Sequence, residues 1–285
     1  MGVADELEQG RKAIPPARDR LQSTLLLWIA GPLLIWSALG PPLGARRLGL
    51  PLWPLAFPLV FSACFAVLVR LLRAATTAAA VMGFLICYIL AQSTEMWERY
   101  SPYPQPSLAV MALVAVFVLT FAATRFGRSR KETRGVAESR RGRRASQIVA
   151  NLGVAALFAA AGQYEGSIAA LAEAAADTIS SEIGQAVGGP ARLLTTGCSV
   201  PAGTDGGITM VGTIMGVAAA AVIAAIGGAH HAFWPGKTAI WLGACAGLFF
   251  DSLLGATVER RGWIGNDLVN FASTLVAALI AAGFT

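Results

Sequence analysis

The sequence has few charged residues. Only 13% of its 285 residues are Asp, Glu, Lys or Arg, whereas a soluble domain has about 25%. Together with 55% hydrophobic residues and a mean hydropathy of +0.62, this scarcity excludes an ordinary soluble protein and indicates an integral membrane protein. The alternating pattern of a transmembrane barrel strand is also missing. Helices are therefore the remaining way to satisfy the backbone hydrogen bonds in lipid.

Common metal-binding and hydrolytic motifs are absent as well. The four cysteines are dispersed without a CxxC pair, which argues against a zinc or disulfide framework (Cys64, Cys87, Cys198 and Cys245). The neighbouring His230 and His231 have no third ligand nearby. No G-x-S-x-G hydrolase motif occurs. The segment beginning at Gly236 is not a phosphate-binding P-loop, because His231 occupies the position of its first glycine.

Nine apolar segments divide the rest of the chain. They lie at about 24–40, 54–72, 74–92, 107–124, 146–162, 166–184, 206–229, 237–258 and 267–284. Each is close to the roughly 20 residues that cross a bilayer core. We expect an all-α, polytopic membrane bundle of about eight or nine helices, with a tail at 1–22 and one membrane domain at 23–285. The segments at 146–162 and 166–184 are short or glycine-interrupted, so broken or re-entrant helices are expected there.

The basic residues predict the orientation of these helices. The net charge is +6, but Lys and Arg lie mainly beside the apolar segments, which favours lipid headgroups over nucleic acid as their partner. The loop at 125–145 carries nine Lys or Arg against two Glu and is expected to be cytoplasmic, like the N-terminus. Only Arg46 and Arg47 disagree with this orientation. We expect the protein to lie in the inner (cytoplasmic) membrane.

Four polar segments interrupt the second half of the chain, at 176–184, 201–207, 251–259 and 265–270. An ionised Asp at the centre of a membrane helix costs roughly 2.5–3.5 kcal/mol, so such residues usually share a polar site. Counting helices from the basic loop brings all four segments to the cytoplasmic face. The sequence therefore predicts one cytoplasmic site, and the residue types indicate that it handles phosphates.

Four carboxylates are candidates for binding Mg²⁺ in this site: Asp177, Glu182, Asp251 and Asp267. Hard cations prefer oxygen ligands, typically one or two carboxylates with phosphate oxygens and water. Asn266 and Asn270 flank Asp267 and add amide groups. The alternative is that these polar side chains cap helices and form hydrogen bonds between helices.

A glycine-rich segment precedes the apolar stretch that begins near Ile208. Gly203, Thr204, Gly206 and Gly207 could direct backbone N–H groups at a phosphate, aided by the helix N-terminus. A helix-entry turn capped by Thr204 or Asp205 is the competing interpretation.

The end of the basic loop runs into a predicted helix. Arg144, Gln147 and Asn151 lie on one face of that helix, and Arg143 precedes them. Cations can neutralise a transferring phosphoryl group and amides can orient it. Anchoring to lipid headgroups is the alternative for most charges in the loop.

These motifs, taken in order, resemble the integral membrane family that includes transmembrane protein 19 and the phytyl-phosphate kinase of plants and cyanobacteria. The resemblance covers about residues 80–285. Its matching residues are Gly127, Lys131, Gly135, Gly142, Arg143, Arg144, Gln147, Asn151, Asp177, Thr178, Ser181, Glu182, Gly184, Pro201, Gly203, Thr204, Gly206, Gly207, Asp251, Thr257, Asn266, Asp267 and Asn270.

The resemblance implies a kinase that uses a nucleoside triphosphate, with CTP favoured, to convert an isoprenyl monophosphate into the diphosphate. By the resemblance, Asp177, Glu182, Asp251 and Asp267 hold Mg²⁺ or orient the acceptor phosphate, and Lys131, Arg143 and Arg144 bind phosphates. The main alternative is a transporter or scramblase for polyprenyl phosphate or another anionic lipid. Its site would lie near the membrane midplane and be reachable from both faces.

Overall fold

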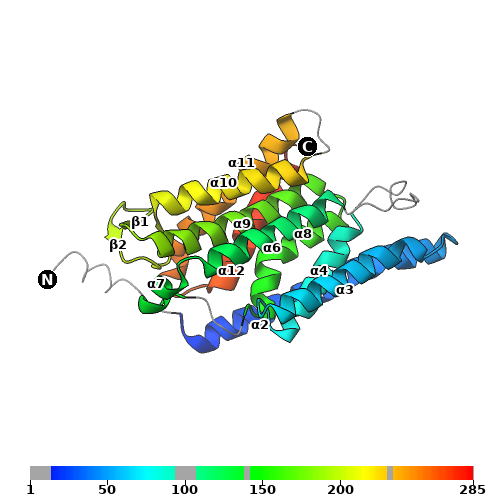
Figure 1. The fold of residues 1–285 in the computed structure, drawn as a ribbon, viewed down its shortest axis with the longest axis horizontal. Helices are drawn as coiled ribbons and strands as arrows, with labels where there is room; N and C mark the ends of the chain where they lie inside the picture. The colour runs from blue at the N-terminus through cyan, green and yellow to red at the C-terminus, as the bar shows by residue number, and fades with distance from the viewer. Residues whose placement is uncertain (1–13, 94–106, 138–141, 230–233, 285) are drawn as a thin grey trace.

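The computed structural model describes residues 14–93, 107–137, 142–229 and 234–284, which form a helical bundle with one very small sheet (Figure 1). The helices of the first half are α2 (Pro16–Arg47), η1 (Trp53–Leu55), α3 (Ala56–Leu71), α4 (Thr77–Ala91), α6 (Leu108–Arg125) and α7 (Arg128–Thr133). Those of the second half are α8 (Ala145–Ala160), α9 (Tyr164–Val187), α10 (Met210–Gly227), α11 (Trp234–Leu254), the π-helical turn η2 (Gly255–Glu259) and α12 (Asn266–Ala282).

Five of these helical stretches are long and apolar enough to cross a membrane. They are α2, the Trp53–Leu71 stretch that joins η1 to α3, α6, α10 and the Gly236–Glu259 stretch of α11 and η2. The shorter helices α4, α8 and α12 are also apolar. This composition confirms the prediction of a polytopic helical membrane protein.

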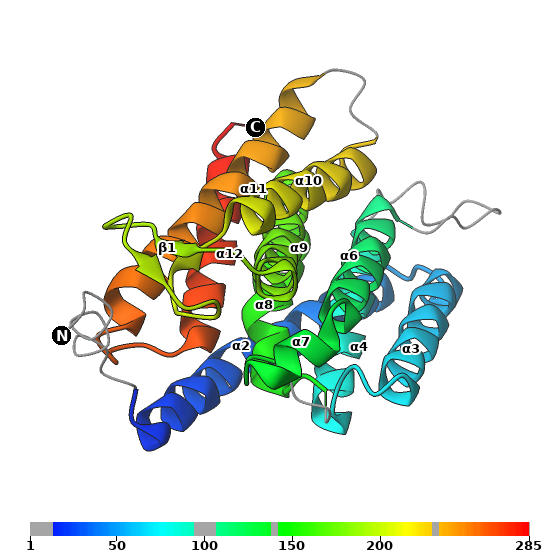
Figure 2. The same cartoon turned by 60° about the vertical axis from the view of Figure 1, so that its left-hand side comes forward.

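Helix α9 lies at the centre of the bundle, in contact with α6, α8, α10, α11 and α12 (Figure 2). It carries several acidic residues, yet the side chains of Ala169, Ala170, Ala172, Ala175 and Ala176 are all fully buried. Small side chains let neighbouring backbones approach closely in membrane bundles. The acidic residues of α9 are therefore presented to its neighbouring helices.

Each of the nine predicted apolar segments is helical, but the boundaries differ from the predictions. Helix α2 begins at Pro16, inside the expected tail, and continues through Pro32, Pro41 and Pro42. The segments expected to be broken form the short but continuous α8 and the continuous α9. The irregular backbone lies instead at η2, which follows α11. Of the expected basic loop, residues 138–141 lie outside the described part of the chain, as do residues 1–13 of the tail.

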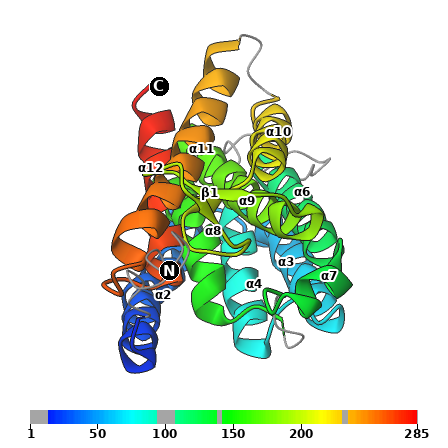
Figure 3. The ribbon, with the colours of Figure 1, turned by 90° about the vertical axis from the view of Figure 1, so that its left-hand side faces the viewer.

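The sequence did not predict the small sheet between α9 and α10. Strands β1 (Ala191–Leu193), β2 (Ser199–Val200) and β3 (Gly207–Ile208) pair antiparallel in the order β2-β1-β3. Helix α9 ends at Val187, where Gly188 and Gly189 adopt positive φ angles before Pro190. The sheet lies over one end of the bundle, which faces the viewer in Figure 3.

That end of the bundle, here called the site end, gathers the loops at 72–76, 188–209 and 260–265 and the described residues at 126–137 and 142–144. The first turn of α2 also reaches it, because Arg18 Nη1 donates to Gly262 O at 3.1 Å. The loop before α4 meets the loop before α8, where Thr76 N donates to Arg143 O at 3.0 Å. The count from Lys and Arg also groups these loops at one face. The side of the membrane that the site end faces stays a prediction.

Candidate functional site

A polar cavity of about 370 Å³ opens at the site end, and all four polar segments contribute to its lining. The expectation that these segments form one site is therefore met. The predicted site residues that line the cavity are Arg143, Gln147, Asn151, Asp177, Glu182, Gly203, Thr204, Gly206, Gly207, Asp251, Asn266 and Asn270. Lys131, Arg144 and Asp267 are not among the residues that line it.

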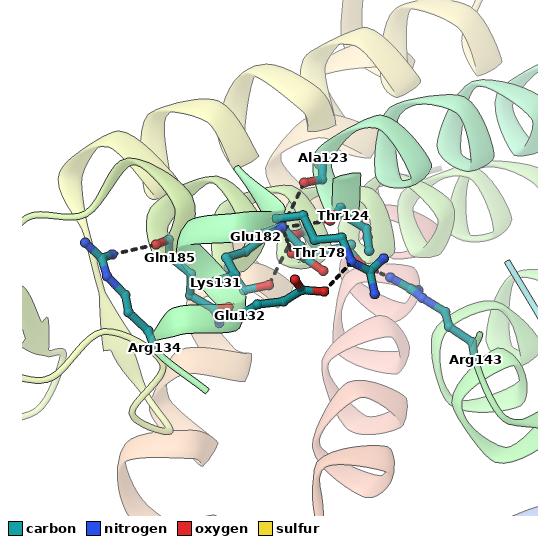
Figure 4. A network of polar contacts seen from close by, with 11 residues as sticks. Ala123, Thr124, Lys131, Glu132, Arg134, Arg143, Thr178, Glu182 and Gln185 are labelled. Carbon is teal, nitrogen blue, oxygen red and sulfur yellow. Dashed lines mark hydrogen bonds and ion pairs between the residues drawn. The ribbon is translucent and has the colours of Figure 1, made fainter. Parts of the chain in front are cut away.

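The charged residues that line the cavity are Arg143 and five acidic residues, Asp177, Glu182, Asp205, Asp251 and Glu259. Asp177 comes from the middle of α9 and Asp251 from the end of α11, and they lie close enough to repel each other electrostatically. Arg143 interacts electrostatically with Asp177, and its Nη2 donates to Thr178 Oγ1 at 3.3 Å (Figure 4). The cavity thus presents both a positive group and a pair of negative oxygen ligands.

Helix α12 holds the carboxylate of Asp251 in place. The single hydrogen of Ser273 Oγ is shared between Asn270 O at 3.0 Å and Asp251 Oδ2 at 3.4 Å. The hydrogen-bond network favours the Asn270 amide orientation in which Nδ2 donates to Asp251 Oδ2 at 3.3 Å and Oδ1 accepts from Asn151 Nδ2 at 3.1 Å. Sequence reasoning missed Ser273, although it follows Asn270 by three residues and so shares its helix face.

The backbone around Arg143 is fixed by the loop before α4. Arg143 N donates to Ala74 O at 2.9 Å, and Arg143 O accepts from Thr76 N at 3.0 Å. The preceding Gly142 has a φ of +78°, and a Cβ there would lie 2.7 Å from Arg73 O and from Ala74 C. Only glycine fits this contact, so Gly142 is what allows the loop to bring Arg143 to the cavity.

The glycine-rich segment is a turn between β2 and β3. Gly206 has a φ of +71°, and a Cβ there would lie 2.1 Å from Ala256 N, so this glycine packs the turn directly against η2. The expected caps are wrong: Thr209 caps α10, with its Oγ1 accepting from Gly212 N at 3.1 Å. Phosphate binding by this segment stays a prediction. Because α10 begins only at Met210, the segment is not itself the N-terminus of that helix.

Lys131 is fully buried away from the cavity. Its ammonium pairs with the Glu182 carboxylate and donates to Thr124 O at 2.9 Å and Ala123 O at 3.2 Å (Figure 4). These three acceptors use all of its donors. Lys131 therefore joins α7 to α9, and the predicted phosphate contact does not fit its position. The pairing also makes Glu182 a poor candidate for a metal ligand.

Asp267 is also buried and engaged elsewhere. Ser23 Oγ of α2 donates to its Oδ2 at 2.6 Å, and Arg144 Nη2 lies 3.9 Å from the same oxygen. The Arg144 side chain is 57% exposed, outside the cavity. Asp267 therefore connects α12 to α2. Neither Asp267 nor Arg144 lines the cavity, and the roles in catalysis and metal binding that the sequence predicts for them stay predictions.

Within the described ranges, there is no group of three or more His, Cys, Asp or Glu side chains that could hold a metal ion. Mg²⁺ does not require such a group, since one or two carboxylates with substrate phosphates and water are its usual ligands. Asp177 and Asp251 fit this smaller ligand set because both line the same open cavity. Of the four predicted metal ligands, Asp177 and Asp251 are therefore the two best placed for a metal ion in the cavity, and metal binding itself stays a prediction.

Comparison with known families agrees with this architecture. The family described as integral membrane protein DUF92 matches residues 60–278. The chain belongs to this family. The match confirms the family that the sequence motifs indicated, and it includes every helix that contributes to the cavity. All of α2, including Ser23, lies outside it.

Three curated relatives of the DUF92 protein are similar over most of its length. Protein VTE6, chloroplastic, of Arabidopsis thaliana is 30% identical over 222 residues, which is 72% of this chain and 65% of the relative. An uncharacterized membrane protein of Synechocystis sp. is 33% identical over 186 residues (61% and 72%). Another, of Methanocaldococcus jannaschii, is 34% identical over 208 residues (70% and 79%). No solved structure matches the chain significantly.

Proposed function

We propose that this DUF92 protein is a Mg²⁺-dependent membrane kinase that transfers a phosphoryl group from a nucleoside triphosphate, with CTP favoured, to an isoprenyl monophosphate. Phytyl and geranylgeranyl phosphate are the acceptors we favour, and the product is the diphosphate. The observation that carries the proposal is the cavity in which Asp177 and Asp251 face Arg143 at one end of a membrane bundle. The sequence resemblance to phytyl-phosphate kinase and the relationship to Protein VTE6 support it.

In the proposed reaction, an oxygen of the acceptor phosphate attacks the γ-phosphorus of the donor. The bond from that phosphorus to the β–γ bridging oxygen breaks, and the nucleoside diphosphate leaves. The acceptor is already an ionised phosphate, so no strong general base is needed. Catalysis then depends mainly on positioning two anions and neutralising their charge.

The residues of the cavity divide these tasks. The guanidinium of Arg143 neutralises charge on the phosphates, and the amides of Gln147 and Asn151 at the start of α8 orient them. Asp177 and Asp251 would hold Mg²⁺, which when bound supplies further charge neutralisation on the phosphate oxygens. Asn270 and Ser273 keep the Asp251 carboxylate directed into the cavity.

The position of the cavity favours a kinase over a transporter. Asp251 lies three residues before the end of α11, where η2 continues the chain to Glu259, and Asn266 is the first residue of α12. Arg143 precedes α8, and only Asp177 lies deeper, in the middle of α9. A transporter site is expected near the midplane, between the ends of its helices. A site at the helix ends suits a substrate whose tail is in the membrane and whose phosphate meets a water-soluble nucleotide. Because that nucleotide is cytoplasmic, we propose that the site end faces the cytoplasm.

The test is a transfer assay with purified protein, Mg²⁺ and each of four γ-labelled nucleoside triphosphates. The acceptors are phytyl, geranylgeranyl and shorter isoprenyl monophosphates. We expect labelled isoprenyl diphosphate, formed fastest from CTP. Absence of transfer with all four donors and every chain length would contradict the kinase proposal. Movement of the lipid phosphate across vesicles without chemistry would favour the transporter instead.

A further inference from the structure

A second cavity, apolar and about 450 Å³ in volume, lies beside the first. Its walls come from α3, α4, α6, α8 and α9, and we call it the tail chamber. Its volume is within the range of about 300–1,000 Å³ that is usual for small-molecule sites. The proposed reaction needs no residue of its apolar walls.

The tail chamber reaches into the bundle and is not a groove on its outer surface. Ile86 of α4, Leu113 of α6 and Ala174 of α9 line it, and each of these side chains is at most 3% exposed. On another side, Phe65 of α3 meets Phe117 of α6 in an edge-to-face contact with 5.4 Å between ring centroids. Lipid that simply coated the exterior would instead contact exposed side chains.

Two residues connect the tail chamber to the polar cavity, since Arg143 and Asn151 line both. The chamber is also bordered by Arg73, Arg125 and Arg128, which belong to the loops and helix ends of the site end. An apolar volume with cations at one end suits an amphiphile that carries an anionic head and an apolar tail. A tail in the chamber would leave its head group at Arg143, beside Asp177.

We infer that the tail chamber binds the isoprenyl chain of the acceptor, with the phosphate directed past Arg143 and Asn151 into the polar cavity. The inference rests on the proposed function for the identity of the head group. It assigns the chain-length selectivity of the enzyme to α3, α4 and α6, which hold most of the apolar wall. A bilayer phospholipid is the competing occupant.

Gly83 of α4 offers a direct test, because it lines the chamber and a Cβ at this position would meet no atom within 4 Å. Gly83→Leu should fill the chamber without disturbing the helices. We expect KM for geranylgeranyl phosphate to rise by about tenfold or more, and KM for geranyl phosphate to rise less. Gly44→Leu in α2 is the matched control, since it also meets no atom within 4 Å and lies outside the chamber. It should behave as wild type.

Binding can be followed without any transfer reaction. Geranylgeranyl phosphate with a photoreactive group at the tail end should label peptides of α3, α4 or α6. Excess phytyl phosphate should suppress the labelling, whereas excess phosphatidylglycerol should not, and Gly83→Leu should weaken it. Equal suppression by phosphatidylglycerol, or labelling confined to α2, would overturn the inference in favour of bilayer lipid.

The two arms separate this inference from the proposed function. If Gly83→Leu transfers phosphate with unchanged KM values, the inference about the tail chamber is wrong, while the kinase proposal still stands. If the wild-type protein transfers no phosphate but is labelled specifically, and phytyl phosphate suppresses the labelling, the kinase proposal is wrong. The tail chamber would then still be a binding site for a lipid phosphate.

Discussion

Residue by residue, the partners of each charged side chain divide the candidates into two groups. Asp177, Asp251 and Arg143 line the cavity, where a phosphate or metal can reach them. Lys131 and Asp267 are satisfied by protein groups and are buried. A buried charge without a partner costs free energy. Lys131 and Asp267 therefore favour the folded state only as long as their hydrogen-bonding and charged partners are present.

Replacing Lys131 by Met tests this assignment. The variant would leave the Glu182 carboxylate buried with its cationic partner removed, since the two side chains are 1% and 8% exposed. We expect the free energy of unfolding to fall by about 3–5 kcal/mol. Thermal unfolding in detergent, followed by circular dichroism, measures the effect.

The double variant Lys131→Met with Glu182→Gln is the control, because it removes both charges together. It should recover part of the lost stability, as expected when a buried pair is replaced as a unit. If the double variant is less stable than the single one by the full cost of a second independent substitution, the two side chains do not act as a pair.

The sequence could not separate the two groups of residues. From the sequence, Asp251 and Asp267 look equally functional, because each places a carboxylate in an apolar segment at a similar cost in free energy. The difference lies in a partner far along the chain: Ser23, which donates to Asp267, is 244 residues away. No local pattern carries that information.

At the scale of elements, the helices followed directly from their apolar length, because a membrane helix satisfies its own backbone. The sheet of β1, β2 and β3 was not predictable in this way. Its strands have two or three residues each and pair only after α9 and η2 bring their segments together. The turn at Gly206 depends on contact with Ala256, which no periodicity reveals.

The loop that carries Arg143 provides a prediction at this scale. Gly142→Ala should force the backbone away from Arg73 and Ala74 and displace Arg143 from the cavity. We expect kcat/KM to fall by about a hundredfold, as for small misplacements of a positioning group. Steady-state kinetics of phosphate transfer measure this change.

Gly135→Ala is the matched control. Gly135 also has a positive φ, of +71°, but a Cβ there would meet no atom within 4 Å. Both substitutions carry the same kind of backbone strain, so only the collision differs between them. Equal losses of kcat/KM in the two variants would show that strain, and not the position of Arg143, determines the activity.

At the scale of the whole molecule, the helices alternate so that the site end collects the start of α2, the described parts of the basic loop, and Asp177 and Asp251 of the cavity. The positive-inside rule anticipates this grouping because Lys and Arg concentrate in the loops that stay in the cytoplasm. Arg46 and Arg47 end α2 and therefore lie at the other end of that helix.

The native cysteines allow this arrangement to be tested in sealed vesicles. Cys198 lies between β1 and β2 at the site end and is partly exposed, whereas Cys87 is buried. Cys64 and Cys245 lie inside candidate membrane spans, where a membrane-impermeant reagent does not reach them. A membrane-impermeant maleimide should label Cys198 only from the side on which a tag at the N-terminus is open to protease. Cys198→Ser should abolish the signal. Labelling of Cys198 from the opposite side would contradict the prediction that Cys198 and the N-terminus lie on the same side of the membrane.

The central claim is that Asp251 and Asp177 serve phosphoryl transfer in the polar cavity. The most direct measurement is the initial rate of label transfer from γ-labelled CTP to phytyl phosphate in wild type and in Asp251→Asn, with thermal unfolding recorded for both. We predict labelled phytyl diphosphate from wild type, a rate lower by about a hundredfold or more in the variant, and similar unfolding temperatures. A near wild-type rate in Asp251→Asn would contradict the account.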